Sequence, residues 1–230
     1  MNETLFQVLT SIIPLVVAIV FHEVAHGYVA KLLGDPTAAE LNRLSLNPIR
    51  HVDPVGTIIL PGLLKLAGGP VFGWAKPVPV NKWRLRNPRF GMMAVAAAGP
   101  GSNLVMALLT AVVLGLLSRT NLGGASILEN APFITANLVN FLTINIFLAL
   151  FNLLPIPPFD GSHILEGLLP RSMAMTYAKL HRFGFPLVFL LLIVIPWMIP
   201  SFNPLAWLLM PPFEWLTGHY LSLAGTVAGH

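Results

Sequence analysis

Four long stretches of the chain contain no charged residue, and this feature restricts the fold more than any other. Residues 4–21, 91–117, 130–159 and 183–213 hold no Asp, Glu, Lys or Arg. About 20 apolar residues in a helix span the roughly 30 Å hydrocarbon core of a bilayer. Over all 230 residues, 55% are hydrophobic and 10% are charged, whereas a soluble domain has about 25% charged residues. We therefore predict an all-α polytopic membrane protein with about five to six transmembrane helices.

The uncharged runs and their flanking Gly and Pro residues set the expected helices. We expect long helices over about 5–33, 91–117, 132–154 and 185–199, and a short helix over about 162–169. The tail, 203–230, either spans the membrane or lies at its interface. Neither an internal repeat nor a separate soluble domain is visible in the sequence.

The basic residues predict the topology. If residues 55–72 enter and leave the membrane on one side, every Lys and Arg except Arg119 lies on that same side. Cytoplasmic loops are enriched in Lys and Arg, so we predict that 55–72 is re-entrant from the cytoplasmic face and that the N-terminus is outside. Broken backbone at membrane depth must be buried in protein or line a wet cavity.

Two classes of chemistry are excluded by composition. The chain has no cysteine, which removes disulfides and thiolate metal ligands. Its net charge is +4, and no basic run lies on an amphipathic helix, so we expect no nucleic-acid partner.

The first uncharged run leads into "FHEVAHG", residues 21–27, which places three ionisable side chains at membrane depth. Residues four apart on a helix share a face, so His22 and His26 can share one Zn²⁺ ion. Glu23 is offset from them, as in the H-E-x-x-H arrangement of zinc proteases. Ionisable groups inside a membrane cost at least about 2.5 kcal/mol each, and a cation bound by both histidines offsets that cost. The alternative is a polar cluster that only packs against another helix.

A catalytic zinc ion needs a third protein ligand and one open position. The acidic residues near the later helices are Glu129, Asp160 and Glu166. The predicted topology puts Glu129 on the far side of the membrane, and Glu166 lies past the loop on a short segment. Asp160 follows the third long helix on the side where the first helix ends. An Asp before Gly is also common in turns, but we predict Asp160 as the third ligand, with one zinc ion per chain.

Three motifs in this order resemble the site-2 protease family of intramembrane zinc metalloproteases. They are "FHEVAHG" at 21–27, "AAAGPGSN" at 96–103 and "NLLPIPPFDG" at 152–161. The stretches "HVDPVGT" at 51–57 and "GWAKPVPVN" at 73–81 are similar to short, single-domain bacterial and archaeal members. The resemblance covers about residues 10–170, and no run resembles a PDZ domain or a nucleotide-sensing module.

The resemblance implies a role for each candidate site residue. His22, His26 and Asp160 are expected to bind zinc, and Glu23 is expected to be the general base. Asn152 is expected to help bind the substrate or to stabilise the oxyanion, a role for which an amide donor is suitable.

The resemblance also implies the activity and its setting. The expected protein is one intramembrane metalloprotease domain over 1–230, with a catalytic core at about 5–170 and C-terminal helices at about 171–230. It is expected to cut single-span membrane proteins in or near their transmembrane segments. The expected location is the lipid bilayer of the cell membrane, as a multi-pass protein with its active site near the cytoplasmic side.

Two other function classes remain as alternatives. A transporter or channel can use buried His, Glu and Asp as an ion relay, but such proteins usually contain inverted repeats, and none is seen. An inactive family member acting as a scaffold is disfavoured because Glu23 is present.

The remaining motifs give weaker expectations. We expect Gly99, Gly101 and Asn103 to serve close helix packing, and His163 to be a loop histidine or to hydrogen-bond near the zinc. A protease must unwind a helical substrate, and lipid cannot satisfy the freed backbone groups. We therefore predict a small membrane-embedded sheet in 52–80, made of "GTIIL" (56–60) and "KPVPV" (76–80), that pairs with the substrate.

Overall fold

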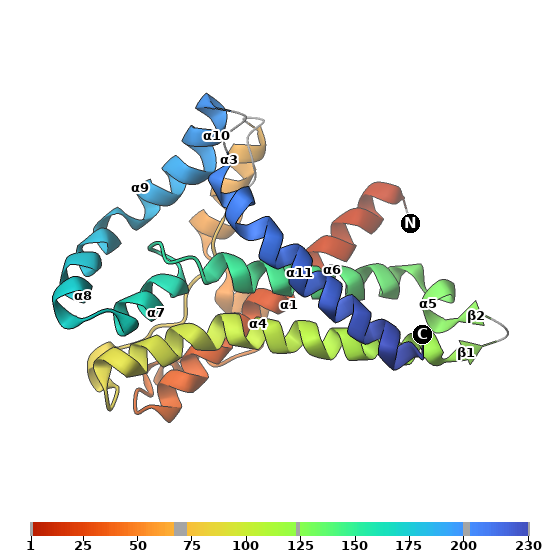
Figure 1. The fold of residues 1–230 in the computed structure, drawn as a ribbon, viewed down its shortest axis with the longest axis horizontal. Coiled ribbons are helices and arrows are strands. Elements are labelled where there is room, and N and C mark those ends of the chain that lie inside the picture. The colour runs from red at the N-terminus through yellow and green to blue at the C-terminus, as the bar shows by residue number, and fades with distance from the viewer. Residues whose placement is uncertain (1, 67–72, 123–124, 200–202, 230) are drawn as a thin grey trace.

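Three long helices form the centre of the molecule (Figure 1). The computed structural model describes residues 2–66, 73–122, 125–199 and 203–229. Within these ranges, α1 (Glu3–Leu32), α4 (Pro88–Arg119) and α6 (Pro132–Asn152) are long and apolar enough to cross a membrane. The predicted helical membrane fold is therefore confirmed in its class, while the predicted total of about five to six spans stays a prediction.

The ends of these helices follow ordinary capping rules. The side chain of Asn2 accepts a hydrogen bond from Leu5 N and begins α1, and Gly34, with a φ of 108°, ends it. A side chain that caps and a left-handed glycine are the usual start and stop of a helix. Asn87 caps α4 in the same way before Pro88. The predicted bounds are close to the observed ones because these signals are local.

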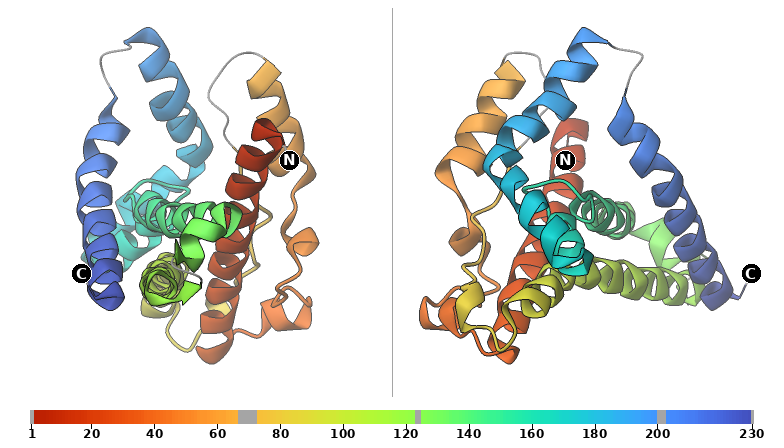
Figure 2. Two further views of the ribbon diagram at one scale, coloured as in Figure 1. Left: turned by 90° about the vertical axis from the view of Figure 1, so that its right-hand side faces the viewer. Right: turned by 60° about the vertical axis from the view of Figure 1, so that its left-hand side comes forward.

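The long helices pack through small residues. Helices α4 and α6 run side by side, and α1 crosses them at a steep angle (Figure 2). Helix α11 (Pro204–Ala228) lies against α4 and α6. Ala107 and Ala111 of α4 are fully buried against Leu142 and Ile146 of α6, because alanines let two helices approach closely.

The chain beyond α6 forms a series of shorter helices that leads away from the centre (Figure 1). They are α7 (Asp160–Leu168), α8 (Arg171–Ala178), η4 (Lys179–Phe183), α9 (Gly184–Phe189), η5 (Leu190–Val194) and α10 (Ile195–Met198). The helix predicted at 185–199 is therefore present as three consecutive helical pieces. The described part of the 203–230 tail forms the single helix α11.

In its described residues, the segment between α1 and α4 holds short elements. They are α2 (Thr37–Glu40), η1 (Pro48–His51), η2 (Pro54–Ile59), α3 (Leu60–Leu66) and η3 (Lys82–Arg84). Between α4 and α6 lie two-residue antiparallel strands, β1 (Asn121–Leu122) and β2 (Ala125–Ser126), and α5 (Ile127–Asn130).

The strand predicted at 56–60 is wrong, because this stretch belongs to η2 and α3. Its start is fixed by Asp53, whose side chain accepts hydrogen bonds from Val55 N and Gly56 N. This cap, followed by Pro54, favours a helical turn over an extended chain. Residues 76–80 have no regular secondary structure and belong to no strand pair in the described structure. Residues 67–72, part of the predicted re-entrant segment, lie outside the described residues.

Candidate metal centre

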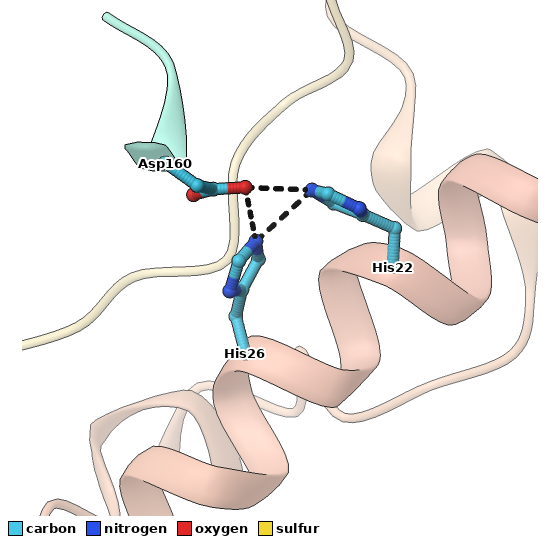
Figure 3. A group of neighbouring side chains, drawn as sticks. All are labelled: His22, His26 and Asp160. Carbon is cyan, nitrogen blue, oxygen red and sulfur yellow. Dashed lines mark hydrogen bonds and ion pairs between the residues drawn. The ribbon is translucent and has the colours of Figure 1, made fainter. Parts of the chain in front are cut away.

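Two histidines of α1 and one carboxylate of α7 converge at the centre of the molecule (Figure 3). The Nε2 atoms of His22 and His26 lie 3.0 Å apart. Asp160 Oδ2 lies 3.2 Å from His22 Nε2 and 3.3 Å from His26 Nε2. Both histidines are buried, with 7% and 9% of their surface exposed. The structure therefore brings together the three residues that the sequence predicts as zinc ligands.

The backbone of α4 orients His26. Its Nδ1 lies 2.7 Å from the carbonyl oxygen of Val95. A carbonyl oxygen only accepts hydrogen bonds, so Nδ1 carries the hydrogen. In the neutral imidazole of His26 the lone pair is consequently on Nε2, the atom that lies beside Asp160.

A chain of amides orients His22. Asn145 donates from Nδ2 to the carbonyl of Phe141 at 2.7 Å, so its Oδ1 is the acceptor for Asn103 Nδ2 at 2.8 Å. Asn103 Oδ1 then faces His22 Nδ1 at 2.6 Å, and this nitrogen must carry the hydrogen. Both asparagines are fully buried. In the neutral imidazole this network fixes the His22 tautomer, with the hydrogen on Nδ1 and the lone pair on Nε2.

The resulting atoms fit a zinc ion. Two Nε2 lone pairs and one carboxylate oxygen face one another, and Asp160 Oδ2 is buried with no hydrogen-bond partner in the described part of the chain. Such a group is unfavourable by itself, because an unpaired buried acceptor is costly. Two imidazoles and one carboxylate are also a common ligand set for catalytic zinc, which leaves a fourth position open. A bound cation would satisfy all three atoms at once.

The charge of Asp160 suits this role. A carboxyl group ordinarily has a pKa of about 3.9, so Asp160 can supply the anionic ligand at neutral pH.

Gly99 lets α4 approach the histidines. A Cβ atom at this position would lie 2.4 Å from His26 Nε2 and 2.6 Å from His22 Cε1. A Cβ atom at Gly101, in contrast, would meet nothing within 4 Å. The expectation that these glycines serve close packing is confirmed for Gly99, whose partner is the candidate metal group itself.

Glu23 lies next to the three-residue group but outside it. Its Oε2 accepts a hydrogen bond of 2.8 Å from the backbone N–H of Val78. This contact places residues 76–80 directly beside Glu23. The segment is also fastened beyond the end of α1, where Asn81 N donates to Asp35 Oδ2 at 2.6 Å. Burial acts to raise the pKa of Asp35, but hydrogen bonds from Thr37 and Asn81 lower it overall.

Asn152 and His163 have other partners in this structure. Asn152 donates from Nδ2 to Leu148 O, one turn back in α6, at 3.0 Å. Its expected role at the oxyanion therefore stays a prediction. His163 is half-buried and lies near Glu166 and His181 rather than in the group at His22. Burial lowers the pKa of His163, and the charge of His181 lowers it further.

Sequence reasoning underrated Asn103 and missed Asn145. Both were visible as polar residues in the middle of long apolar helices, where a buried amide needs a partner. Neither partner could be assigned before α1, α4 and α6 were placed together.

The fold and the site define the class of protein. Membrane-capable helices enclose two histidines and a carboxylate, and a glutamate follows the first histidine in an H-E-x-x-H pattern. This combination is that of a membrane-embedded metallopeptidase.

Comparisons with known proteins agree with this class. The family model described as "Peptidase family M50" matches residues 120–195. The chain is 41% identical over 189 residues to "Putative zinc metalloprotease YwhC" of Bacillus subtilis, covering 80% of each chain. It is 30% identical over 173 residues to "Putative zinc metalloprotease Rip2" of Mycolicibacterium smegmatis, covering 75% of this chain and 62% of the relative. It is 31% identical over 217 residues to Rip2 of Mycobacterium tuberculosis, covering 92% and 76%. No solved structure matches the chain.

The chain belongs to peptidase family M50, the family of the site-2 proteases. The resemblance seen in its motifs is thereby confirmed. The alternative of a transporter or channel receives no support from these comparisons.

Proposed function

We propose that this protein is an intramembrane zinc metalloendopeptidase that cuts single-span membrane proteins in or near their transmembrane segments. The observation that supports it most is the buried group of His22, His26 and Asp160, whose free lone pairs converge beside Glu23. The matched relatives are metalloproteases by name, which agrees with hydrolysis rather than ion transport.

His22, His26 and Asp160 are proposed to hold one catalytic zinc ion per chain. When bound, zinc supplies Lewis-acid polarisation of the scissile carbonyl and increases the acidity of water at the site. The protein's own part is to hold the hydrogen of each neutral imidazole on Nδ1, through Asn103 and the Val95 carbonyl, so that Nε2 is the atom presented to the metal. Asp160 supplies the anionic ligand, and a bound cation takes the place of any proton shared within the group.

Glu23 is proposed as the general base. Its Oε2 is held by Val78 N–H, which leaves Oε1 to take a proton from the attacking water and to pass it to the leaving amine. Asn152 is proposed as a donor to the oxyanion or to the substrate backbone. One hydrogen of its Nδ2 is used by Leu148 O, and the other remains for this role.

The substrate is proposed to bind as an extended chain beside residues 76–80. A regular sheet is not supported, because the N–H groups of Lys76 and Val78 already bond to His51 O and to Glu23. Pro77 and Pro79 have no N–H. Positions 76–79 therefore offer the substrate no free N–H group, and helix-weakening residues near the cut should matter more than strand pairing.

The proposed setting is a multi-pass protein of the cell membrane, with the N-terminus outside and the metal group near the cytoplasmic side. The excess of basic residues at the ends of α1 and α4 near this group supports that orientation. We treat residues 1–230 as one domain, with a catalytic core over about 5–170 and C-terminal helices over about 171–230.

A cleavage assay tests the proposal. Purified protein in liposomes is given single-span substrates that differ only in a Gly-Pro or a Leu-Leu pair near the cleavage site. We expect cleavage that is stopped by a chelator, restored by zinc and faster for Gly-Pro, because that pair weakens the substrate helix. Equal rates for both pairs contradict the extended-substrate proposal, and cleavage that survives complete zinc removal contradicts the metalloprotease proposal.

A further inference from the structure

A second group of metal-binding side chains lies on α7 and η4. It consists of His163, Glu166 and His181, whose ligand atoms all lie within 4.8 Å of one another. His181 Nε2 lies 3.3 Å from Glu166 Oε2, and His163 Nδ1 lies 3.8 Å from the same oxygen. The two imidazole rings are stacked, with centroids 4.7 Å apart and an interplanar angle of 24°.

These distances are close to those of a coordination shell. Two ligands bound at 2.0–2.2 Å to one tetrahedral zinc ion lie about 3.3–3.5 Å apart. The His181–Glu166 pair already has this spacing, and His163 Nδ1, now 3.8 Å from Glu166 Oε2, has to turn toward the same point. His181 Nε2 is buried and has no hydrogen-bond partner among the described residues, its contact with Glu166 being an ion pair.

An ion can reach this group. Between 27% and 32% of each of the three side chains is exposed. His163 and Glu166 also line a cavity of about 430 Å³ between α7, α8 and the start of α4. The cavity gives room for water at the coordination positions that the protein leaves open.

We propose that His163, Glu166 and His181 form a second Zn²⁺ site, separate from the catalytic group. Two imidazoles and one carboxylate are a ligand set that suits zinc. His163 follows Asp160 by three residues on α7, and its group shares no ligand with the group at His22 and His26. The second site adds to the one catalytic zinc ion, so that a fully loaded chain holds about two.

The second zinc ion acts as a structural clasp. Glu166 lies on α7 and His181 on η4, and helix α8 lies between them in the chain. A metal that joins the two closes this loop and restricts its motion. Since η4 leads into α9 and α10, the clasp fixes the direction in which this series of helices leaves α7. An exposed ion pair alone would contribute little.

Metal counting tests the second site. The purified full chain is equilibrated with Zn²⁺ in detergent and its zinc content is measured. We expect about two zinc ions for the wild type, and about one each for His181→Ala and His22→Ala. His219→Ala is the matched control, because His219 bonds only to Trp215 O of its own helix, and it should keep both. A zinc content of His181→Ala equal to that of the wild type overturns the proposal.

Limited proteolysis tests the clasp itself. Lys179 and Arg182 are exposed and flank His181, so trypsin reports directly on η4. Zn²⁺ should slow cleavage there several-fold in the wild type and in His22→Ala, but not in His181→Ala. Because His22→Ala lacks a catalytic ligand, protection in that variant separates the second site from the proposed activity. Zinc that leaves the wild-type cleavage rate unchanged overturns the clasp.

Discussion

His22 Nδ1 and Asn103 Oδ1 lie 2.6 Å apart, and this contact joins the middle of α1 to the middle of α4. Asn103 in turn donates a hydrogen bond from Nδ2 to Asn145 Oδ1 on α6. The three central helices are therefore connected through the residue that orients a candidate zinc ligand. Helix packing and metal binding depend on the same buried groups.

Removal of Asn103 should weaken zinc binding without removing a ligand. In Asn103→Ala, His22 loses the acceptor that fixes its tautomer, and we expect zinc affinity to fall by about 10–100-fold. Competition with a fluorescent zinc chelator measures this. Thr110→Val is the matched control, because Thr110 is buried in the same helix and bonds only to Met106 O. Equal losses in both variants would mean that Asn103 acts through helix stability alone.

Alanine substitutions at Gly99 and Gly101 form a second pair of test variant and matched control. Gly99→Ala puts a methyl group 2.4 Å from His26 Nε2, so the histidines must move and zinc content should drop well below that of the wild type. Gly101→Ala has open space around its Cβ and should keep its zinc. The measurement is zinc per chain after gel filtration, together with helicity by circular dichroism. Normal zinc in Gly99→Ala would contradict the observed approach of α4.

A substitution at Gly27 tests the proposed base separately from the metal ligands. A Cβ atom there would lie 2.6 Å from Leu44 and 2.7 Å from Val78, so Gly27→Ala should displace the segment that holds Glu23. We expect zinc to stay and the cleavage rate to fall by up to about 10²-fold, the cost of a base misplaced by about 1 Å. Gly225→Ala, with nothing near its Cβ, is the control. Loss of zinc in Gly27→Ala would show that the segment supports the ligands instead.

The topology can be read with single cysteines, because the chain has none of its own. Arg86, Arg119 and Arg171 are all exposed. Cysteines at Arg86 and Arg171 should be labelled from the cytoplasmic side by a membrane-impermeant maleimide, and one at Arg119 only from outside. Labelling of Arg86 and Arg171 from opposite sides is the outcome that rules out the proposed orientation.

The sequence was most informative where the cause of structure is local. The uncharged runs place α1, α4 and α6, since bilayer thickness sets the length of a span. The spacing of His22 and His26 gives two ligands from helix geometry alone. Asp160 was preferred from the predicted topology, which puts Glu129 on the far side, and from its place directly after the third long helix, whereas Glu166 lies past the loop.

Other features depend on tertiary contacts that no local pattern encodes. Residues 56–60 look like a strand by composition, yet Asp53 caps them into a helical turn. The partner of Asn145 is a residue on another helix, and His181 approaches His163 only after α8 folds back. The contact of Val78 N–H with Glu23 likewise joins a loop to a helix 55 positions away.

The most direct test of the catalytic assignment compares three variants for zinc content and cleavage in the same preparation. Glu23→Gln should keep its catalytic zinc and lose at least about 10²-fold in cleavage rate, since a general base contributes that much. His22→Ala and Asp160→Ala should lose the catalytic zinc and all cleavage. Cleavage near the wild-type rate in Glu23→Gln, or an unchanged zinc content in Asp160→Ala, would contradict the account.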